Sequence, residues 1–426
     1  MSTPGSDEDA WYGSPPETWS DSRLKYVFKE VPTRGSPDFP SGAISFGEVV
    51  QKQMLNEETL DSYQDVRAGE FLVNPINLNY DLKSLRTALS SLDVRVSPAY
   101  IVLEQVGGNK PRYLRWLLHL FDVAHMKTLG AGVRQTIKFA DIGACRAFLP
   151  PMEKQERIAN FLDEKTARID ALIAEKERLE ESLKGIDEVT AFDLVTRGLV
   201  VTAHRSSFRE DWLREVPSHW SLLKLRNIAS VGNGSTPKRD NPVYWVGGET
   251  PWLNSGSVNA PRITDASDYV TDVARSECHL PKVRAGSTVV ALTGQGKTRG
   301  SASLVEIDTT INQHLAYLSR YDERMSDEYL WVLLTGMYSV LRYISDGEGS
   351  TKGALTCEQL NQLRVPVPPH SEQAEIVTTY LERASSIEGL RNHVSEHISL
   401  LREYRSSLIS AAVTGQLNIS ANGANA

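Results

Sequence analysis

The residues best suited to chemistry lie in Ala291–Thr298, where the run Gly294-Gln-Gly-Lys297-Thr298 approximates a nucleotide-phosphate loop. In such a loop, glycine amides cradle the phosphates and the lysine reaches them, but a strand must precede the loop and a helix must follow it. A preceding strand fits the sequence. Residues 299–306 carry Gly and Ser and then alternate like a second strand, which favours a strand–loop–strand hairpin. An NTPase that uses Lys297 and Thr298 stays the alternative.

The same hairpin would carry polar side chains on a glycine-rich tip, together with two further basic loops. Arg, Lys and Gln are side chains that read base edges in a DNA major groove. No such glycine-rich loop is apparent in the first half of the chain, around Asn74–Asn77. Solvated surface charge is the alternative for each residue. The candidate DNA contacts are Lys238, Arg239, Gln295, Lys297, Arg299, Ser350 and Lys352 in the second half, and Asn77 and Arg134 in the first.

The sequence contains few patterns that are typical of catalytic or metal-binding sites. His393 and His397 have the i, i+4 spacing of metal ligands, but His397 falls on an apolar stripe, which favours packing. The three cysteines lie far apart, so neither a disulfide framework nor a CxxC site is indicated. No nucleophile elbow, paired-acid site or S-adenosylmethionine motif is present. We therefore expect no catalytic residue, no metal and no cofactor in this chain.

Length and charge narrow the function further. A chain of 426 residues exceeds what one hydrophobic core supports, so at least two domains are expected. The net charge is −8, yet residues 216–367 carry 15 basic and 15 acidic groups, and the acid is concentrated in residues 1–19 and 152–199. A DNA partner must then be held by local loops or with help from a basic partner. No apolar run approaches a membrane span, and unpaired thiols fit a cytoplasmic protein.

The elements that position these residues are duplicated. Pro150-Pro151 and Pro368-Pro369 are 218 residues apart, and the match at that offset runs without a gap to Leu199 and Leu417. Gln155 pairs with Gln373 in this alignment. The halves also begin alike, with Pro16-Glu-Thr-Trp19 and Pro217-Ser-His-Trp220. The segments between these anchors share little, so the scaffold is repeated while the two middles differ.

Each diproline is followed by a long amphipathic helix. Apolar residues recur at 3-4 spacing and form one stripe, which needs a partner helix. The other copy is the nearest candidate, so we expect a coiled coil, with a weakening near Gly185. The expected packing residues are Ile158, Leu162, Ile169, Leu172, Leu179 and Leu183 in the first copy, and Ile376, Ile387, Leu390, Val394 and Leu401 in the second.

The predicted fold class is α/β (α+β), with two recognition domains separated by a pair of long helices. One helix per domain is expected, at Tyr113–Phe121 and Tyr329–Leu334. A coiled-coil adaptor without DNA contact is a third alternative. The predicted parts are a disordered leader (1–14), domain 1 (15–150), helix 1 (151–199), a linker (200–215), domain 2 (216–367), helix 2 (368–418) and a disordered tail (419–426).

These motifs resemble the specificity subunits of type I restriction-modification systems. The residues that carry the resemblance are the two Pro-x-x-Trp entries, Pro242-Val-Tyr-Trp245 with Pro251-Trp252, Ser350-Thr-Lys-Gly353, Val365-Pro-Val-Pro-Pro-His-Ser-Glu-Gln373, and Val413-Thr-Gly-Gln-Leu417. The resemblance covers nearly the whole chain beyond the leader.

The resemblance implies a non-catalytic subunit whose two domains each read one part of a bipartite, asymmetric DNA site. It implies antiparallel helices that act as a spacer and bind partner subunits. Double-stranded DNA and methyltransferase subunits, two of them expected, are then the partners, with restriction subunits as further partners. S-adenosylmethionine, ATP and Mg²⁺ would belong to those partner subunits.

Overall fold

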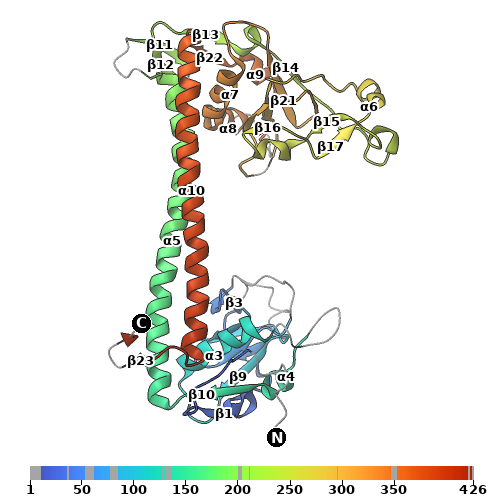
Figure 1. Cartoon of the computed structure of the whole chain (residues 1–426). Helices are drawn as coiled ribbons and strands as arrows, with labels where there is room; N and C mark the ends of the chain where they lie inside the picture. The colour runs from blue at the N-terminus through green and yellow to red at the C-terminus, as the bar shows by residue number, and fades with distance from the viewer. Residues whose placement is uncertain are drawn as a thin grey trace. The chain divides into compact units, whose positions relative to one another are not determined.

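The computed structural model describes residues 11–426 except 36–37, 53–61, 77–84, 127–128, 130–135, 200–203, 211, 295, 347–352, 421–422 and 425–426. The chain divides into two units: unit 1 comprises residues 1–176 and 396–426, and unit 2 comprises residues 177–395. Each unit contains one mixed domain and part of each of two long helices (Figure 1). The predicted α/β class with two domains and paired helices is confirmed.

Unit 1 is built on short antiparallel strands. A four-stranded sheet has the order β2 (Phe28–Glu30), β9 (Ile101–Gln105), β6 (Phe71–Val73) and β7 (Thr87–Leu89). The remaining pairs are β1 (Ser20–Arg23) with β10 (Arg146–Leu149), β3 (Gly42–Ser45) with β4 (Glu48–Gln51), and β5 (Gln64–Val66) with β8 (Val94–Val96). The helices of this domain are α1 (Leu24–Val27), α3 (Pro111–Ala124) and α4 (Phe139–Ala144).

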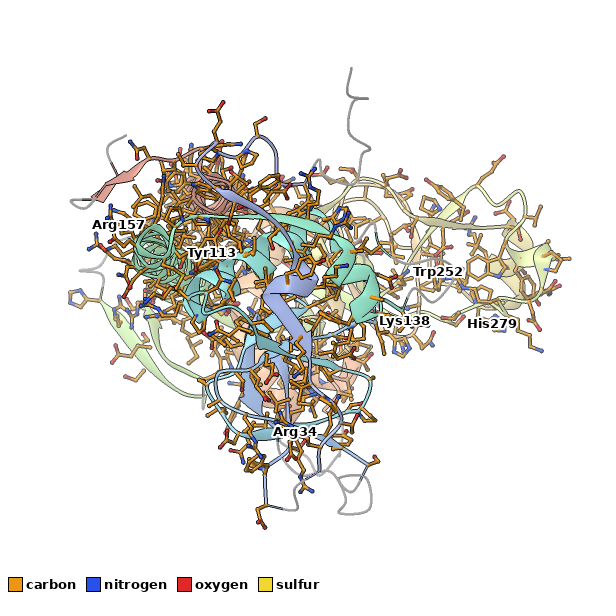
Figure 2. The ribbon with its side chains drawn as sticks, turned by 90° about the horizontal axis from the view of Figure 1, so that it is seen from below. Arg34, Tyr113, Lys138, Arg157, Trp252 and His279 are labelled. Atoms are coloured by element: carbon orange, nitrogen blue, oxygen red, sulfur yellow. The ribbon has the colours of Figure 1, made fainter. Side chains whose placement is uncertain are left out.

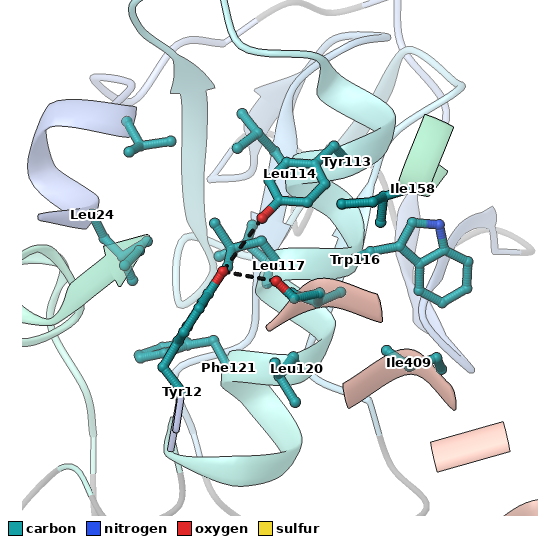
Figure 3. Close-up of a cluster of buried hydrophobic side chains, with 14 of the residues drawn as sticks. Tyr12, Leu24, Tyr113, Leu114, Trp116, Leu117, Leu120, Phe121, Ile158 and Ile409 are labelled. Carbon is teal, nitrogen blue, oxygen red and sulfur yellow. Dashed lines mark hydrogen bonds between the residues drawn. The ribbon is translucent and has the colours of Figure 1, made fainter. Parts of the chain in front are cut away.

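The core of unit 1 lies around α3, which matches the helix expected at Tyr113–Phe121. Its apolar side chains pack against the long helices and against Trp11 and Tyr12. The Tyr12 hydroxyl donates to the carbonyl of Val413 at 2.8 Å and lies 3.5 Å from the Tyr113 hydroxyl (Figure 3). Residues 1–14 were expected to be a disordered leader, and this boundary is wrong, because two buried aromatic side chains belong to the core.

Unit 2 contains a larger sheet. Its five strands have the order β14 (Ala229–Asn233), β21 (Leu315–Arg320), β18 (Thr288–Ala291), β19 (Ala302–Val305) and β16 (Arg262–Ile263). A three-stranded sheet has the order β17 (Asp268–Val270), β15 (Thr250–Leu253) and β20 (Thr310–Ile311). Two further pairs are β11 (Arg205–Glu210) with β12 (Leu213–Pro217) and β13 (Ser221–Lys224) with β22 (Arg364–Val367).

Three short helices of unit 2 contribute side chains to its second core, and a fourth packs beside the three-stranded sheet. They are α6 (Asp272–Glu277), α7 (Asp327–Gly336), α8 (Tyr338–Asp346) and α9 (Cys357–Gln362). Helix α7 includes the segment expected at Tyr329–Leu334. Residues 200–215, expected as a linker, instead contain β11 and part of β12, because Leu213 and Val216 bury their side chains in the core of unit 2.

The long helices are α5 (Met152–Arg197) and α10 (His370–Val413). In unit 1, Ile158, Leu162 and Ile169 of α5 share a core with Leu408 and Ile409 of α10. In unit 2, Leu194 and Val195 of α5 share a core with Ile376 and Tyr380 of α10. The start of each helix therefore packs with the end of the other, which is the antiparallel arrangement. Helix α5 runs unbroken through Gly185, where a weakening was expected.

Part of the predicted stripe does not pack. Leu172, Leu179 and Leu390 are 47%, 45% and 55% exposed, whereas the other eight predicted packing residues are buried or half-buried. The reason is geometric: a pair of helices buries one narrow seam, and a 3-4 pattern is wide enough to leave a second row facing out. His397 is exposed instead of packed, as is His393.

The predicted disordered tail is also corrected at its first residues. Ile419 is buried in the unit 1 core, and β23 (Ile419–Ser420) pairs with β24 (Gly423–Ala424). An apolar side chain beside a core gains more from burial than from exposure to water. Within the described part of the chain, no helix combines the length and the apolarity that crossing a bilayer requires.

Candidate nucleic-acid interface

The glycine-rich segment of unit 2 is a hairpin. Strands β18 and β19 pair antiparallel, and the Gly300 amide donates to the Ala291 carbonyl at 2.9 Å to close the loop between them. The sequence prediction of a strand–loop–strand hairpin is therefore confirmed. A phosphate loop needs a helix directly behind it, whose amides face the phosphates. Because β19 follows instead, the NTPase alternative that uses Lys297 and Thr298 is wrong.

Lys297, a predicted DNA contact, extends from this loop to the long helix α5. Its Nζ lies 2.7 Å from Oε1 of Glu181, and both side chains are mostly exposed. The hydrogen bond raises the pKa of Lys297 and lowers that of Glu181. The Tyr338 hydroxyl and the Arg342 guanidinium also hold the loop, through the carbonyls of Lys297 and Gly296. Gln295 lies outside the described residues.

Arg299 occupies a different place from the one the sequence predicts. Its side chain is 8% exposed, and Nη2 contacts the carboxylate of Asp346 at the end of α8. A buried guanidinium needs a charge partner, and Asp346 supplies one. The structure thus corrects the base-reading role proposed for Arg299, because its side chain is buried and its guanidinium is engaged by Asp346. Ser350 and Lys352 of the neighbouring loop lie outside the described residues.

The loop between β14 and β15 is tightly anchored at its start. The Gly234 amide donates to the Asn312 carbonyl at 3.1 Å, and the Ser235 hydroxyl donates to the Cys278 carbonyl at 2.8 Å. A side chain at Gly234 is impossible here, since its Cβ would stand 1.7 Å from the Ile311 carbonyl oxygen. Lys238, a predicted DNA contact, is exposed on this loop, and its carbonyl accepts from Trp245 Nε1 at 2.9 Å.

Arg239, the second predicted contact on this loop, is held by aromatic rings and a carboxylate. Its guanidinium lies 4.1 Å from the Trp245 ring centre and 4.9 Å from that of Trp252, which Figure 2 labels. It also forms hydrogen bonds of 3.0 and 3.1 Å with the two oxygens of Asp268. This bidentate pairing raises the pKa of Arg239 and lowers that of Asp268. Arg239 is thus preorganised, and it fixes the loop that presents Lys238.

Sequence reasoning missed several polar residues on and beside this loop, which are Thr236, Thr293, Gln313 and His314. Thr236 donates to Oε1 of Gln313 at 2.6 Å, and the Thr293 hydroxyl lies 2.8 Å from Nδ1 of His314. Gln313 and His314 are exposed and connect β20 to β21. We call Thr236, Lys238, Thr293, Gln313 and His314 the polar loop cluster. The sequence signal was weak: Asn312-Gln-His is a short polar run between two apolar strands.

Unit 1 contains an equivalent hairpin that the sequence did not reveal. Strands β6 and β7 pair antiparallel, and β6 follows Val66-Arg-Ala-Gly69 as β18 follows Val283-Arg-Ala-Gly286. Arg86, directly before β7, is buried and pairs with Asp122 of α3. The expected contacts Asn77 and Arg134 lie outside the described residues. The described part of unit 1 therefore contains a hairpin that corresponds to the hairpin of unit 2.

A family model, described as the type I restriction modification DNA specificity domain, matches residues 217–392. Two relatives come from Methanocaldococcus jannaschii. The type I restriction enzyme MjaIX specificity subunit is 27% identical over 201 residues, 46% of this chain and 45% of its own length. The putative type I restriction enzyme MjaX specificity subunit is 20% identical over 428 residues, 96% of this chain and 95% of its own length.

Two solved structures share the fold. One, from work on complex assembly and conformational transition of the type I R-M system, has a TM-score of 0.71 at 17% identity and covers 95% of this chain and 100% of its own. The HsdS subunit from Thermoanaerobacter tengcongensis has a TM-score of 0.52 at 18% identity and covers 95% and 98%. With its duplicated domains and antiparallel long helices, this chain is similar over nearly its whole length to type I restriction-modification specificity subunits, and its residues 217–392 match the DNA specificity domain of that family.

Proposed function

We propose that this chain is the DNA sequence-recognition subunit of a type I restriction-modification complex. Each domain reads one half of a bipartite, asymmetric DNA site, and the long helices set the separation of the half-sites. The observation that carries the proposal is the repeated plan: each unit holds a hairpin-bearing domain joined to an antiparallel helix pair. Two unlike readers on one repeated scaffold specify two unlike half-sites, which makes the whole site asymmetric.

In unit 2 the polar loop cluster and the hairpin loop form the proposed DNA surface. Lys238 and Lys297 supply positive charge, and Thr236, Gln313 and His314 supply donors and acceptors that can meet base edges or phosphates. Arg239 takes part as a positioning residue, because Asp268 and two tryptophans already engage it. In this assignment, the predicted contacts Lys238 and Lys297 remain in the DNA surface, and Arg239 acts indirectly by positioning its loop.

The helices also dock methyltransferase subunits. In unit 2, Leu179, Ile186 and Val189 of α5 and Leu390 of α10 are large apolar side chains that stand 45–61% exposed. A cavity of about 460 Å³ adjoins Val189 and is lined also by Phe192, Trp212 and Tyr343. Exposed apolar rows on a helix pair are typical of partner interfaces. Two methyltransferase subunits are expected, one for each unit, with restriction subunits as further partners.

The chain itself carries no catalysis in this proposal. S-adenosylmethionine, ATP and Mg²⁺ belong to the partner subunits, and the complex works in the cytoplasm. With 15 basic and 15 acidic residues in 216–367, the isolated chain binds DNA weakly, because its partners neutralise most of the phosphates.

The test is methylome sequencing of a host that carries the methyltransferase genes with and without this chain. The expected result is one split, asymmetric methylated motif that appears only with the chain present. Exchanging residues 216–367 for those of another specificity subunit should change one half of that motif and leave the other half intact. Methylation that ignores the exchange would overturn the proposal. Tight, sequence-specific DNA binding by the isolated chain at physiological salt would contradict the proposal that partner subunits neutralise most of the phosphates.

A further inference from the structure

A buried arginine stands at the base of the hairpin in each unit and pairs with an aspartate of a following helix. In unit 2 the pair is Arg299 with Asp346 of α8, and in unit 1 it is Arg86 with Asp122 of α3. Each arginine lies in the segment where the chain returns toward the second strand of its hairpin. The two hairpins share no sequence around these arginines, so the equivalence is visible only in the structure.

In unit 2, Arg299 lies at the base of the hairpin loop and also beside Gly353. The next residue, Gly300, closes the hairpin through the Ala291 carbonyl, so the position of Arg299 fixes the base of the loop that carries Lys297. A Cβ at Gly353 would stand 1.9 Å from Arg299 Nη1 and 2.7 Å from the Asp346 carboxylate. Gly353 therefore lies directly against the ion pair.

In unit 1 the aspartate holds the limb of the hairpin that carries Arg86, and Arg86 in turn is hydrogen-bonded to the other limb. Asp122 accepts hydrogen bonds from the backbone amide of Arg86 and, at 3.0 Å, from its Nε. The Arg86 carbonyl in turn accepts from the Asn74 amide at 2.7 Å, across the hairpin at the end of β6. Helix α3 thus holds the base of the hairpin through one carboxylate.

Stability alone does not account for these pairs. Nη1 and Nη2 of Arg86, and Nε of Arg299, are buried without a hydrogen-bond partner in the described part of the chain. A buried arginine with unsatisfied nitrogens is a weaker source of stability than apolar residues of similar volume. What the charge pair does supply is a fixed direction for the hairpin relative to the helix.

We propose that Arg299 and Arg86 are positioning residues, each fixing the DNA-facing hairpin of its own unit through an aspartate. This rests on the proposed function, because it requires each hairpin to contribute to reading one half-site. The ion pairs set the accuracy of recognition, and each pair affects the half-site of its own domain alone.

The experiment uses the full chain assembled with methyltransferase subunits and measures methylation rates on duplexes in which one half-site at a time carries single-base changes. Asp346→Asn and Arg299→Met should lower discrimination in one half-site about tenfold and leave the other within about twofold. Asp122→Asn and Arg86→Met should do the same in the opposite half-site. Arg299→Lys, which keeps the charge, should restore part of the discrimination, and it carries the test if Arg299→Met fails to fold.

Matched controls break ion pairs at the opposite end of the same hairpins. Asp327 pairs with Arg284 before β18, and Glu70 pairs with Arg34 before β6. Asp327→Asn and Glu70→Gln should leave discrimination unchanged even if they lower the melting temperature. Equal effects of Asp346→Asn and Asp327→Asn, or an equal loss at both half-sites, would overturn the proposal. If the wild-type complex methylated all DNA sequences equally, the proposed function itself would be wrong.

Discussion

Gln155 and Gln373, at equivalent positions of the two copies, make matching hydrogen bonds in the two units. Oε1 of Gln155 accepts from the amide of Lys110, and Oε1 of Gln373 accepts from the amide of Ser326, at 2.9 and 2.8 Å. Lys110 and Ser326 are the N-cap residues of α3 and α7. Each glutamine also donates to a proline carbonyl at the start of its long helix, at 3.0 and 2.8 Å. One buried amide thus joins each recognition domain to its long helix.

Replacing Gln373 with Met should therefore loosen unit 2 from its helix. The change leaves the Ser326 amide and two carbonyls without partners, and should lower the free energy of unfolding by about 2–4 kcal/mol. Urea unfolding followed by tryptophan fluorescence measures the loss. Gln362→Met, at an exposed site in the same unit, is the control, with an expected change within about 0.5 kcal/mol. Equal losses of stability in both variants would show that the buried Gln373 amide does not join unit 2 to its helix.

Lys297 and its partner Glu181 allow a phosphate contact to be told from a structural one. Lys297→Ala should weaken binding of the assembled complex to all DNA sequences alike and reduce the log–log salt slope by about one. Glu181→Gln should keep both affinity and slope, because it frees the lysine without removing its charge. If Glu181→Gln reproduces the loss seen with Lys297→Ala, the lysine acts by tying its loop to α5.

Arg239→Ala should destabilise the loop between β14 and β15. It removes two cation–π contacts and a bidentate ion pair, together worth about 1–2 kcal/mol at this half-exposed site. The fluorescence of Trp245 and Trp252 should shift to the red as water reaches the rings. Arg275→Ala, which breaks an exposed helical pair with Asp272, serves as the control and should change neither stability nor emission. An unshifted emission in Arg239→Ala would show that the arginine does not order the rings.

His119 should make unit 1 sensitive to acid. Burial, with help from Arg405 and Arg115, lowers the pKa of His119 to about 4. The unfolded chain takes up this proton near pH 6.5 and the folded chain does not, so stability falls as the pH drops from about 6.5 to 4. Acidification through this range should lower the free energy of unfolding by about 1–2 kcal/mol, because the His119 side chain is only partly buried. The free energy of unfolding should be measured for wild type and for His119→Gln at pH 7 and at pH 4.5. The difference between the two proteins should be smaller at pH 4.5 than at pH 7. A difference that stays constant with pH would refute the assignment.

The helices are expected to act as a ruler. Four residues inserted at matched points, after Leu172 in α5 and opposite it in α10, add about 6 Å and turn the stripe by only about 40°. The methylated motif should keep both half-sites while the unread gap lengthens by about two base pairs. Two-residue insertions turn the seam away from its partner helix and should abolish methylation. A gap that stays the same after the four-residue insertions would mean that the partner subunits set the spacing.

The amino-acid sequence by itself determined the repeated scaffold. Two diprolines 218 residues apart, each followed by Gln155 or Gln373 and a long apolar stripe, indicated the paired helices and the two domains. The alternation around Gly294–Gly300 also predicted the hairpin and disfavoured a phosphate loop. These inferences succeed because periodicity and turn chemistry are local properties, readable over a few neighbouring residues.

Only the tertiary structure decided which charged and apolar side chains face water. Arg299 meets Asp346 across 47 residues of sequence, Arg86 meets Asp122 across 36, and Lys297 meets Glu181 across 116. Nothing in the spacing of such residues marks them as partners, so one sequence cannot tell a buried arginine from a base-reading one. In the same way, Leu172 and Leu162 share one helical stripe, yet only Leu162 lies against a core. Burial depends on what the rest of the chain places beside a residue, and local pattern does not contain that information.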